Sequence, residues 1–328
     1  MKYSTTSLVA AAALSWAAVS TAEDVLYSKR ALEKRFIDEQ GNYNMCKSRD
    51  RSCLLQFRII ACDIQPANKY ITAFYHINDV HAHLAEFRSS GVECPDPGRG
   101  CFGGYARVKS VIDESRPTHN DSLFLNVGDE FQGTLYYSFY GGEKIAETLN
   151  QLGFDGMTLG NHEFDGGDDK LGAFLANLTD IPIISANIQS THPILNATIK
   201  PYHIYEQFGL AVIGVTTPET PSISSPGKGT TFSDPIKAVQ DTIEHIKRTT
   251  NITRIAAITH IGYEEDKKLA EGTTGLQLIM GGHSHTLLGD MAGAEGKYPT
   301  IAENKDGDEV FIVTAYVLPL DLISLNLN

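Results

Sequence analysis

Five short groups of polar residues constrain this sequence most strongly, because each one directly follows an apolar, β-prone run. We call them the ligand groups, and they read Asp79-Val80-His81, Gly128-Asp129, Gly160-Asn161-His162-Glu163, Thr259-His260 and Gly281-Gly282-His283-Ser284-His285. In α/β sheets, functional sites form outside the carboxyl ends of the strands. The sequence therefore predicts that the ligand groups meet at one edge of a sheet.

The rest of the chain supports this placement, since apolar strand-like runs alternate with segments of helical spacing from residue 70 onward. We expect strands at 71–77, 122–127, 157–159, 181–186, 210–216, 254–259, 275–280 and 310–315. We expect helices at 105–115, 143–152, 170–178 and 235–247. This alternation predicts a layered α/β domain.

The ligand groups contain side chains that suit divalent cations. The candidates are Asp79, His81, Asp129, Asn161, His260, His283 and His285. Nitrogen and oxygen ligands in this number are enough for two cations, and paired cations are typical of phosphoryl chemistry. Asp129 has two carboxylate oxygens, so it is the candidate bridge between them. A single group would be explained as turn formation at a strand end, but five such groups favour a site.

The amino terminus has the character of a secretory signal. Lys2 precedes an Ala-rich apolar run at 8–19, and small residues at 20–22 form a cleavage site. We therefore expect a signal peptide over 1–22 and a secreted protein. A membrane anchor is the competing interpretation, but the run is shorter than the ~20 residues that a span needs, so no transmembrane span is expected.

Residues 23–66 show no clean period, and we expect a leader or pro-segment there. Its two dibasic pairs, Lys29-Arg30 and Lys34-Arg35, are either processing sites or ordinary solvated charges. The remainder, 67–328, is expected to form the domain that carries the ligand groups.

The five cysteines fit an oxidising compartment. Cys94 and Cys101 flank a turn-rich loop, and we expect a disulfide between them. Three cysteines then remain in the leader, at Cys46, Cys53 and Cys62. A zinc site built on cysteine is the weaker alternative, because the spacings are not C-x-x-C.

Four N-x-S/T sequons predict N-glycosylation of a secreted protein. They lie at Asn120, Asn177, Asn196 and Asn251. The formal net charge of -13 argues against binding a nucleic acid polymer through the general surface. A small anion remains a suitable partner wherever bound cations make the local electrostatic potential positive.

The ligand groups resemble the motifs of the calcineurin-like metallophosphoesterases, and more narrowly those of the secreted 5'-nucleotidase family. The matching segments are N-D-V-H at 78–81, G-D-E-F-Q-G at 128–133, G-N-H-E-F-D at 160–165, T-H at 259–260 and G-G-H-S-H-T at 281–286. The resemblance extends over about 70–315. It implies a layered α-β-β-α sandwich and a hydrolase that releases phosphate from extracellular nucleotides.

The resemblance also implies a role for each candidate ligand. One metal would be held by Asp79, His81, Asp129 and His285, and the other by Asp129, Asn161, His260 and His283. Zinc is the expected metal, and manganese or iron suits the same ligands. The position of His285 is often Gln or Asn in this family, but histidine is a competent ligand there.

The family mechanism would place a hydroxide between the two metals to attack phosphorus. His162, paired with Asp165, would stabilise the transition state and protonate the leaving oxygen. The alternative for Asp165 is to cap the helix expected at 170–178.

Members of the 5'-nucleotidase family carry a second, carboxyl-terminal domain that holds the nucleotide, and we expect that domain to be missing from this sequence. Two alternatives follow. One is a catalytically weak, secreted nucleotide-binding protein left by truncation. The other is a hydrolase with apyrase, UDP-sugar or cyclic-nucleotide specificity. A generic phosphodiesterase is disfavoured by the 160–165 motif.

Overall fold

The computed structural model describes residues 60–61, 72–88, 92, 94–96, 101–119, 121–316 and 323–325. The expected signal peptide at 1–22, the leader at 23–66 apart from 60–61, and the sequon at Asn120 lie outside the described residues. Within the described ranges, no helix has both the length and the apolar character that crossing a membrane requires.

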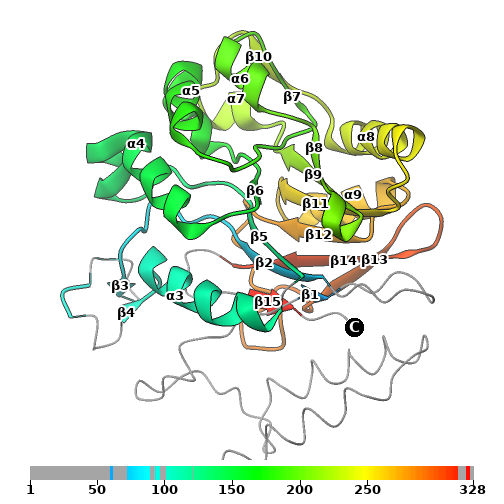
Figure 1. Cartoon of the computed structure of the whole chain (residues 1–328), viewed down its shortest axis with the longest axis horizontal. Coiled ribbons are helices and arrows are strands. Elements are labelled where there is room, and N and C mark those ends of the chain that lie inside the picture. Colours follow the sequence, from blue (N-terminus) through cyan, green and yellow to red (C-terminus); the bar gives the residue numbers. More distant parts are fainter. Residues whose placement is uncertain are drawn as a thin grey trace, which may run out of the picture.

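Two sheets form the centre of the molecule (Figure 1). In the first sheet, β2 (Ala73–Ile77) pairs parallel with β5 (Ser122–Asn126), which pairs parallel with β6 (Gly156–Met157). The short strands β1 (Ile60–Ala61) and β15 (Ile323–Leu325) both pair antiparallel with β2. The three parallel strands therefore end at the same edge.

The second sheet is larger and has a parallel centre. Its order in the described chain is β13 (Thr300–Glu303), β14 (Glu309–Thr314), β12 (Leu278–Gly281), β11 (Arg254–His260), β9 (Leu210–Thr216) and β8 (Tyr202–Tyr205). The strands β9, β11, β12 and β14 run parallel, while β8 and β13 pair antiparallel at the two edges.

Helices cover the outer face of each sheet. The first sheet is covered by α3 (Tyr105–Ser115), α4 (Leu135–Leu152) and α5 (Gly167–Asn177), and the second by α8 (Pro235–Thr249) and α9 (Tyr263–Gly272). Alternation along β2 shows the layering, since Tyr75 packs in the cluster under α3–α5 while Phe74 packs in the cluster between the sheets. The predicted α/β sandwich with α-β-β-α layers is confirmed.

Shorter strands and helices lie outside these two sheets and their covering helices. They are β3 (Phe87–Arg88) paired with β4 (Cys101–Phe102), β7 (Ile188–Ser190) paired with β10 (Thr230–Phe232), and the helices α6 (Pro193–Thr198) and α7 (Thr220–Ile223). A disulfide joins Cys94 to Cys101, with 5.9 Å between their Cα atoms. The sequon residues Asn177, Asn196 and Asn251 are exposed, which glycosylation requires.

The strand predicted at 181–186 is wrong. The backbone there bonds successively to Met157, Lys200 and Gly214, which lie on different segments, so no ladder forms. The side chains of Ile183 and Ile184 are nevertheless buried, in two different clusters. An apolar run that passes between two layers has the composition of a strand without its pairing.

The helix predicted at 143–152 is longer than expected. It begins at Leu135 and continues across a kink at Gly141, where the backbone has φ 64° and ψ -163°. The added turn exposes Leu135 and Phe139, at 82% and 80% of their surface. Because these apolar residues lie on the exposed face of the helix, the first part of α4 does not show the amphipathic spacing from which a helix is predicted.

Candidate metal centre

The ligand groups meet where the ends of the two sheets come together. Asp79 and His81 follow β2, Asp129 follows β5, and Asn161 follows β6 in the first sheet. His260 ends β11, and the remaining group follows β12 in the second sheet. The site is therefore built by strand ends of both sheets, and not by the edge of one sheet.

The backbone turns sharply at most of these positions. Five of the seven candidate ligands have a positive φ, namely Asp79 (53°), His81 (48°), Asp129 (58°), His283 (79°) and His285 (50°). Such a conformation is uncommon for residues other than glycine and tends to occur at functional sites. The strained turns redirect these side chains from the strand direction toward one point.

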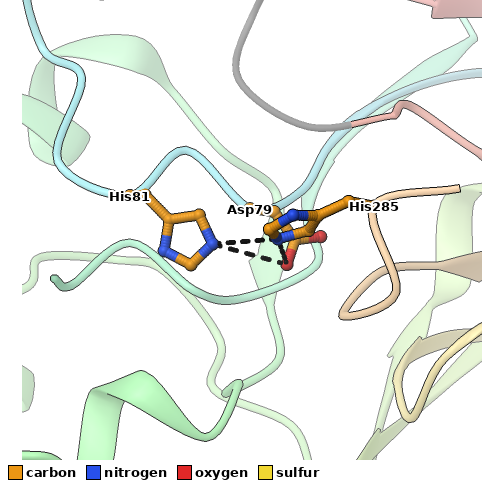
Figure 2. Close-up of side chains that lie close together, drawn as sticks. All are labelled: Asp79, His81 and His285. Carbon is orange, nitrogen blue, oxygen red and sulfur yellow. Dashed lines mark hydrogen bonds and ion pairs between the residues drawn. The ribbon is translucent and has the colours of Figure 1, made fainter. Parts of the chain in front are cut away.

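Asp79, His81 and His285 form the first cluster (Figure 2). The Nε2 atom of His285 lies 3.2 Å from Oδ1 of Asp79 and 3.0 Å from Nε2 of His81. The third distance, from His81 Nε2 to Asp79 Oδ1, is 3.9 Å. Two imidazole nitrogens and one carboxylate oxygen therefore converge, which is a donor set that zinc, manganese and iron accept.

Asp129, His260 and His283 form the second cluster. The Nε2 atom of His260 lies 3.0 Å from Oδ2 of Asp129. Asp129 also belongs to a third cluster with His81 and His162. Because its carboxylate reaches toward both sets of histidines, Asp129 occupies the position that a bridging ligand needs.

One buried polar atom in this centre, Oδ1 of Asn161, has no hydrogen-bond partner among the described residues. Buried polar atoms are almost always satisfied, so an unpaired amide oxygen beside these clusters fits a cation. The Nε2 atom of His260 has only the carboxylate of Asp129 beside it, at 3.0 Å. The opposite ring nitrogen of His260 lies 2.8 Å from the carbonyl of Val127. As its donor, Nδ1–H leaves the Nε2 lone pair free for a metal.

The close packing of charged side chains in this centre shifts the pKa values of His260 and Asp129. Burial alone would lower the pKa of His260, but the carboxylates of Asp129 and Asp79 raise it to about 10. Burial would raise the pKa of Asp129, yet His260 and His81 hold it well below its usual range. Because these carboxylates favour the protonated imidazole, a proton competes with a cation for Nε2 of His260, and metal affinity should be weaker at low pH.

His162 and Asp165 lie beside these clusters. The Nδ1 atom of His162 is 2.7 Å from Oδ2 of Asp165, and both side chains are about a quarter exposed. Burial would lower the pKa of His162, but Asp129 and Asp165 together raise it above its ordinary value. Asp165 does not cap α5, whose N-cap residue is Gly166.

Glu163 has a role that sequence reasoning missed. Its carboxylate is buried and accepts the backbone N–H groups of Asp129, Glu130, Phe131 and Gly160, at 3.0, 2.7, 3.2 and 2.6 Å. It therefore ties the loop after β5 to the loop after β6. The sequence offered one signal for this role, the position of Glu163 inside a ligand group. It could not show the partners, because three of the four N–H donors lie 32 to 34 residues earlier in the chain.

Asp266 was also missed, because α9 was not predicted. Its Oδ1 accepts the hydroxyl of Thr259 at 2.6 Å, next to His260. Burial raises the pKa of Asp266 to about 8. This hydrogen bond supports the end of β11, and Asp266 belongs to none of the candidate metal-binding groups among the described residues.

Comparisons with known proteins agree with this geometry. A family model described as calcineurin-like phosphoesterase matches residues 72–287, which include all seven candidate ligands. A bovine (Bos taurus) 5'-nucleotidase is 37% identical over 251 residues, covering 74% of this chain and 43% of the relative. A snake venom 5'-nucleotidase from Gloydius brevicauda is 36% identical over 274 residues, covering 79% and 45%.

Solved structures show the same relationship. A 5'-nucleotidase precursor from Thermus thermophilus matches with a TM-score of 0.67 and 37% identity, over 74% of this chain and 48% of that one. The NAD nucleotidase of Haemophilus influenzae matches with a TM-score of 0.68 and 31% identity, over 75% and 45%. The chain thus spans less than half the length of these relatives.

Proposed function

Because the chain belongs to the calcineurin-like phosphoesterase family, we propose that it is a two-metal phosphohydrolase that releases phosphate from nucleotides. The observation that carries this proposal is that the two clusters are connected by a third group, which shares His81 with the first cluster and Asp129 with the second. The unpaired, buried Oδ1 of Asn161 supports it, since this oxygen would gain a partner in a bound cation.

The residues sort into two sets around the shared carboxylate. Asp79, His81 and His285 would complete one metal with Asp129. His260, His283 and Asn161 would complete the other. When bound, two divalent cations supply Lewis-acid stabilisation of a phosphoryl group and a lowered pKa for water. Zinc is our preferred metal, with manganese or iron as suitable substitutes.

His162 would deliver a proton to the leaving oxygen. Since a carboxylate can only accept hydrogen bonds, the contact with Asp165 assigns the proton on Nδ1 to that bond and leaves Nε2 for the substrate. The carboxylates of Asp129 and Asp165 raise the pKa of His162, which favours the protonated imidazole that a general acid requires.

A nucleotide is the proposed substrate class, and secretion is the proposed location. The names of the bovine, venom and bacterial relatives support the substrate class. The expected signal peptide and the exposed sequons support secretion. A small aryl phosphate should also react, because it needs only the metal centre and His162.

Metal removal tests the proposed function. The chain stripped with EDTA is expected to release no phosphate from AMP or p-nitrophenyl phosphate, and added Zn²⁺ or Mn²⁺ is expected to restore release. The measurement is a phosphate assay of both substrates at several metal concentrations. Turnover of neither substrate at any metal concentration would refute the proposal. Turnover of the aryl ester alone would support the hydrolase and refute the nucleotide specificity.

A further inference from the structure

We propose that Ser224 is a positioning residue for His162, acting through Asp165. The inference rests on the proposed phosphoester hydrolysis, in which His162 protonates the leaving oxygen. Ser224 lies at the end of α7, far along the chain from the ligand groups, and no comparison assigns it a role. Three side chains from two separate segments form one hydrogen-bonded row that ends at the metal centre.

The row uses both oxygens of one carboxylate. The hydroxyl of Ser224 donates to Oδ1 of Asp165 at 2.7 Å. The other oxygen, Oδ2, accepts from Nδ1 of His162, also at 2.7 Å. Because each oxygen has a different partner, the carboxylate cannot rotate without breaking a bond. The plane of the carboxylate, and with it the His162 ring, is fixed by Ser224.

The far end of the row reaches the metal centre. A ring nitrogen of His162 lies within 4.8 Å of ligand atoms of Asp129 and His81. The backbone N–H of His162 also donates to Oδ1 of Asp129 at 2.9 Å. A small rotation of the ring would therefore change where Nε2 points relative to a phosphoryl group held in the centre. Side chains that orient a reactive imidazole commonly matter for activity in this way.

The loop that carries Ser224 is anchored without its hydroxyl. Oδ1 of Asp168 accepts the backbone N–H of Gly227 at 2.8 Å, and Oδ2 accepts the hydroxyl of Thr230 at 2.6 Å. The backbone N–H of Ser224 itself donates to the carbonyl of Thr220 at 2.9 Å. Removing the hydroxyl therefore deletes one hydrogen bond to Asp165 and leaves the loop in place.

The carboxylate needs this partner because it is not sealed from solvent. Asp165 and His162 have side-chain exposures of 25% and 26%, so water competes for both. An exposed carboxylate held by one partner would sample several orientations, and only some of them would keep Nδ1 of His162 bonded. The hydroxyl of Ser224 selects among these orientations, and this predicts a moderate effect on rate, with no effect on metal affinity.

The test compares Ser224→Ala with Ser222→Ala and Ser224→Thr. Ser222 is the matched control, because it is exposed and its hydroxyl bonds only within its own turn, to the carbonyl of Glu219 at 2.7 Å. Threonine keeps the hydroxyl, and the extended backbone at position 224 (φ -144°, ψ -162°) suits a β-branched residue. The kcat is measured on phenyl phosphate, whose leaving oxygen needs a proton, and on p-nitrophenyl phosphate, whose leaving oxygen needs little help.

We expect Ser224→Ala to lower kcat on phenyl phosphate about 10-fold, with a much smaller loss on p-nitrophenyl phosphate. Ser222→Ala and Ser224→Thr should resemble the wild type on both esters, and Mn²⁺ affinity measured by calorimetry should be unchanged. Equal rates for Ser224→Ala and Ser222→Ala would overturn the inference while the hydrolase stands. An equal loss of kcat on both esters in Ser224→Ala would also overturn the inference while the hydrolase stands. An inactive wild type would overturn the proposed function and this inference with it.

Discussion

Replacing Asp129 with alanine is expected to lower the rate of phosphate release about 10³-fold or more. Asp129 belongs to the second cluster and also to the group with His81 and His162 that connects it to the first. In the proposed assignment its loss therefore removes a ligand from both metals. Lewis-acid stabilisation by bound metals is worth several kcal/mol, and each 1.36 kcal/mol corresponds to about tenfold in rate. The measurement is kcat/KM on p-nitrophenyl phosphate with Mn²⁺ in excess.

The control for this loss is the exposed carboxylate Asp241 on α8, since Asp241→Ala should keep the wild-type rate. Removing a buried carboxylate next to His260 also strains the fold, because it leaves a buried imidazole without its 3.0 Å partner. Asp129→Asn keeps the size of the side chain and should lose activity to a similar degree. A rate above a tenth of the wild-type rate in a folded Asp129 variant would contradict the bridging role.

Replacing His162 with alanine is expected to lower kcat on phenyl phosphate by about 10²- to 10⁴-fold, the usual contribution of a general acid. The loss should be far smaller on p-nitrophenyl phosphate, because its leaving oxygen departs without a proton. Binding of Mn²⁺ should persist, since His162 is proposed as an acid and not as a ligand. The measurement is kcat on both esters together with calorimetric titration of the metal.

His245→Ala is the matched control for this variant, because His245 is exposed on α8. It should leave the rate on both esters unchanged. An equal loss on both esters in His162→Ala would contradict the proton-donating role. A loss of Mn²⁺ binding would instead make His162 a ligand, which its place in a cluster with His81 and Asp129 would then explain.

The centre of the fold could be predicted because its elements carry local patterns. The helix expected at 105–115 and the strand expected at 210–216 have those bounds in the structure, as α3 and β9. Each has a single apolar face or a continuous buried run, which periodicity detects. The edge strands β8 and β13 and the helix α9 were missed, since their burial is incomplete and their periods are weak.

The convergence of the candidate ligands could also be anticipated, because short motifs hold most of the side chains. The residues that support the ligands, Glu163 and Ser224, could not be anticipated. The carboxylate of Glu163 bonds to a loop more than 30 residues earlier, and Ser224 reaches Asp165 across 59 positions. The residues with positive φ at 79, 81 and 129 are likewise held by tertiary contacts, since the N–H groups of Asp79 and His81 donate to the carbonyls of Gly128 and Asp129. Such features depend on tertiary contacts that one sequence does not display.

The central claim is that one centre binds two divalent cations and that Asp129 links them. Calorimetric titration of the metal-free chain with Mn²⁺ tests it most directly, because Mn²⁺ prefers the oxygen and imidazole ligands of this centre over the thiols of Cys46, Cys53 and Cys62. A two-metal centre predicts two equivalents of Mn²⁺ bound per wild-type chain and at most one in Asp129→Asn. A single equivalent in the wild type, or two equivalents retained in Asp129→Asn, would contradict it.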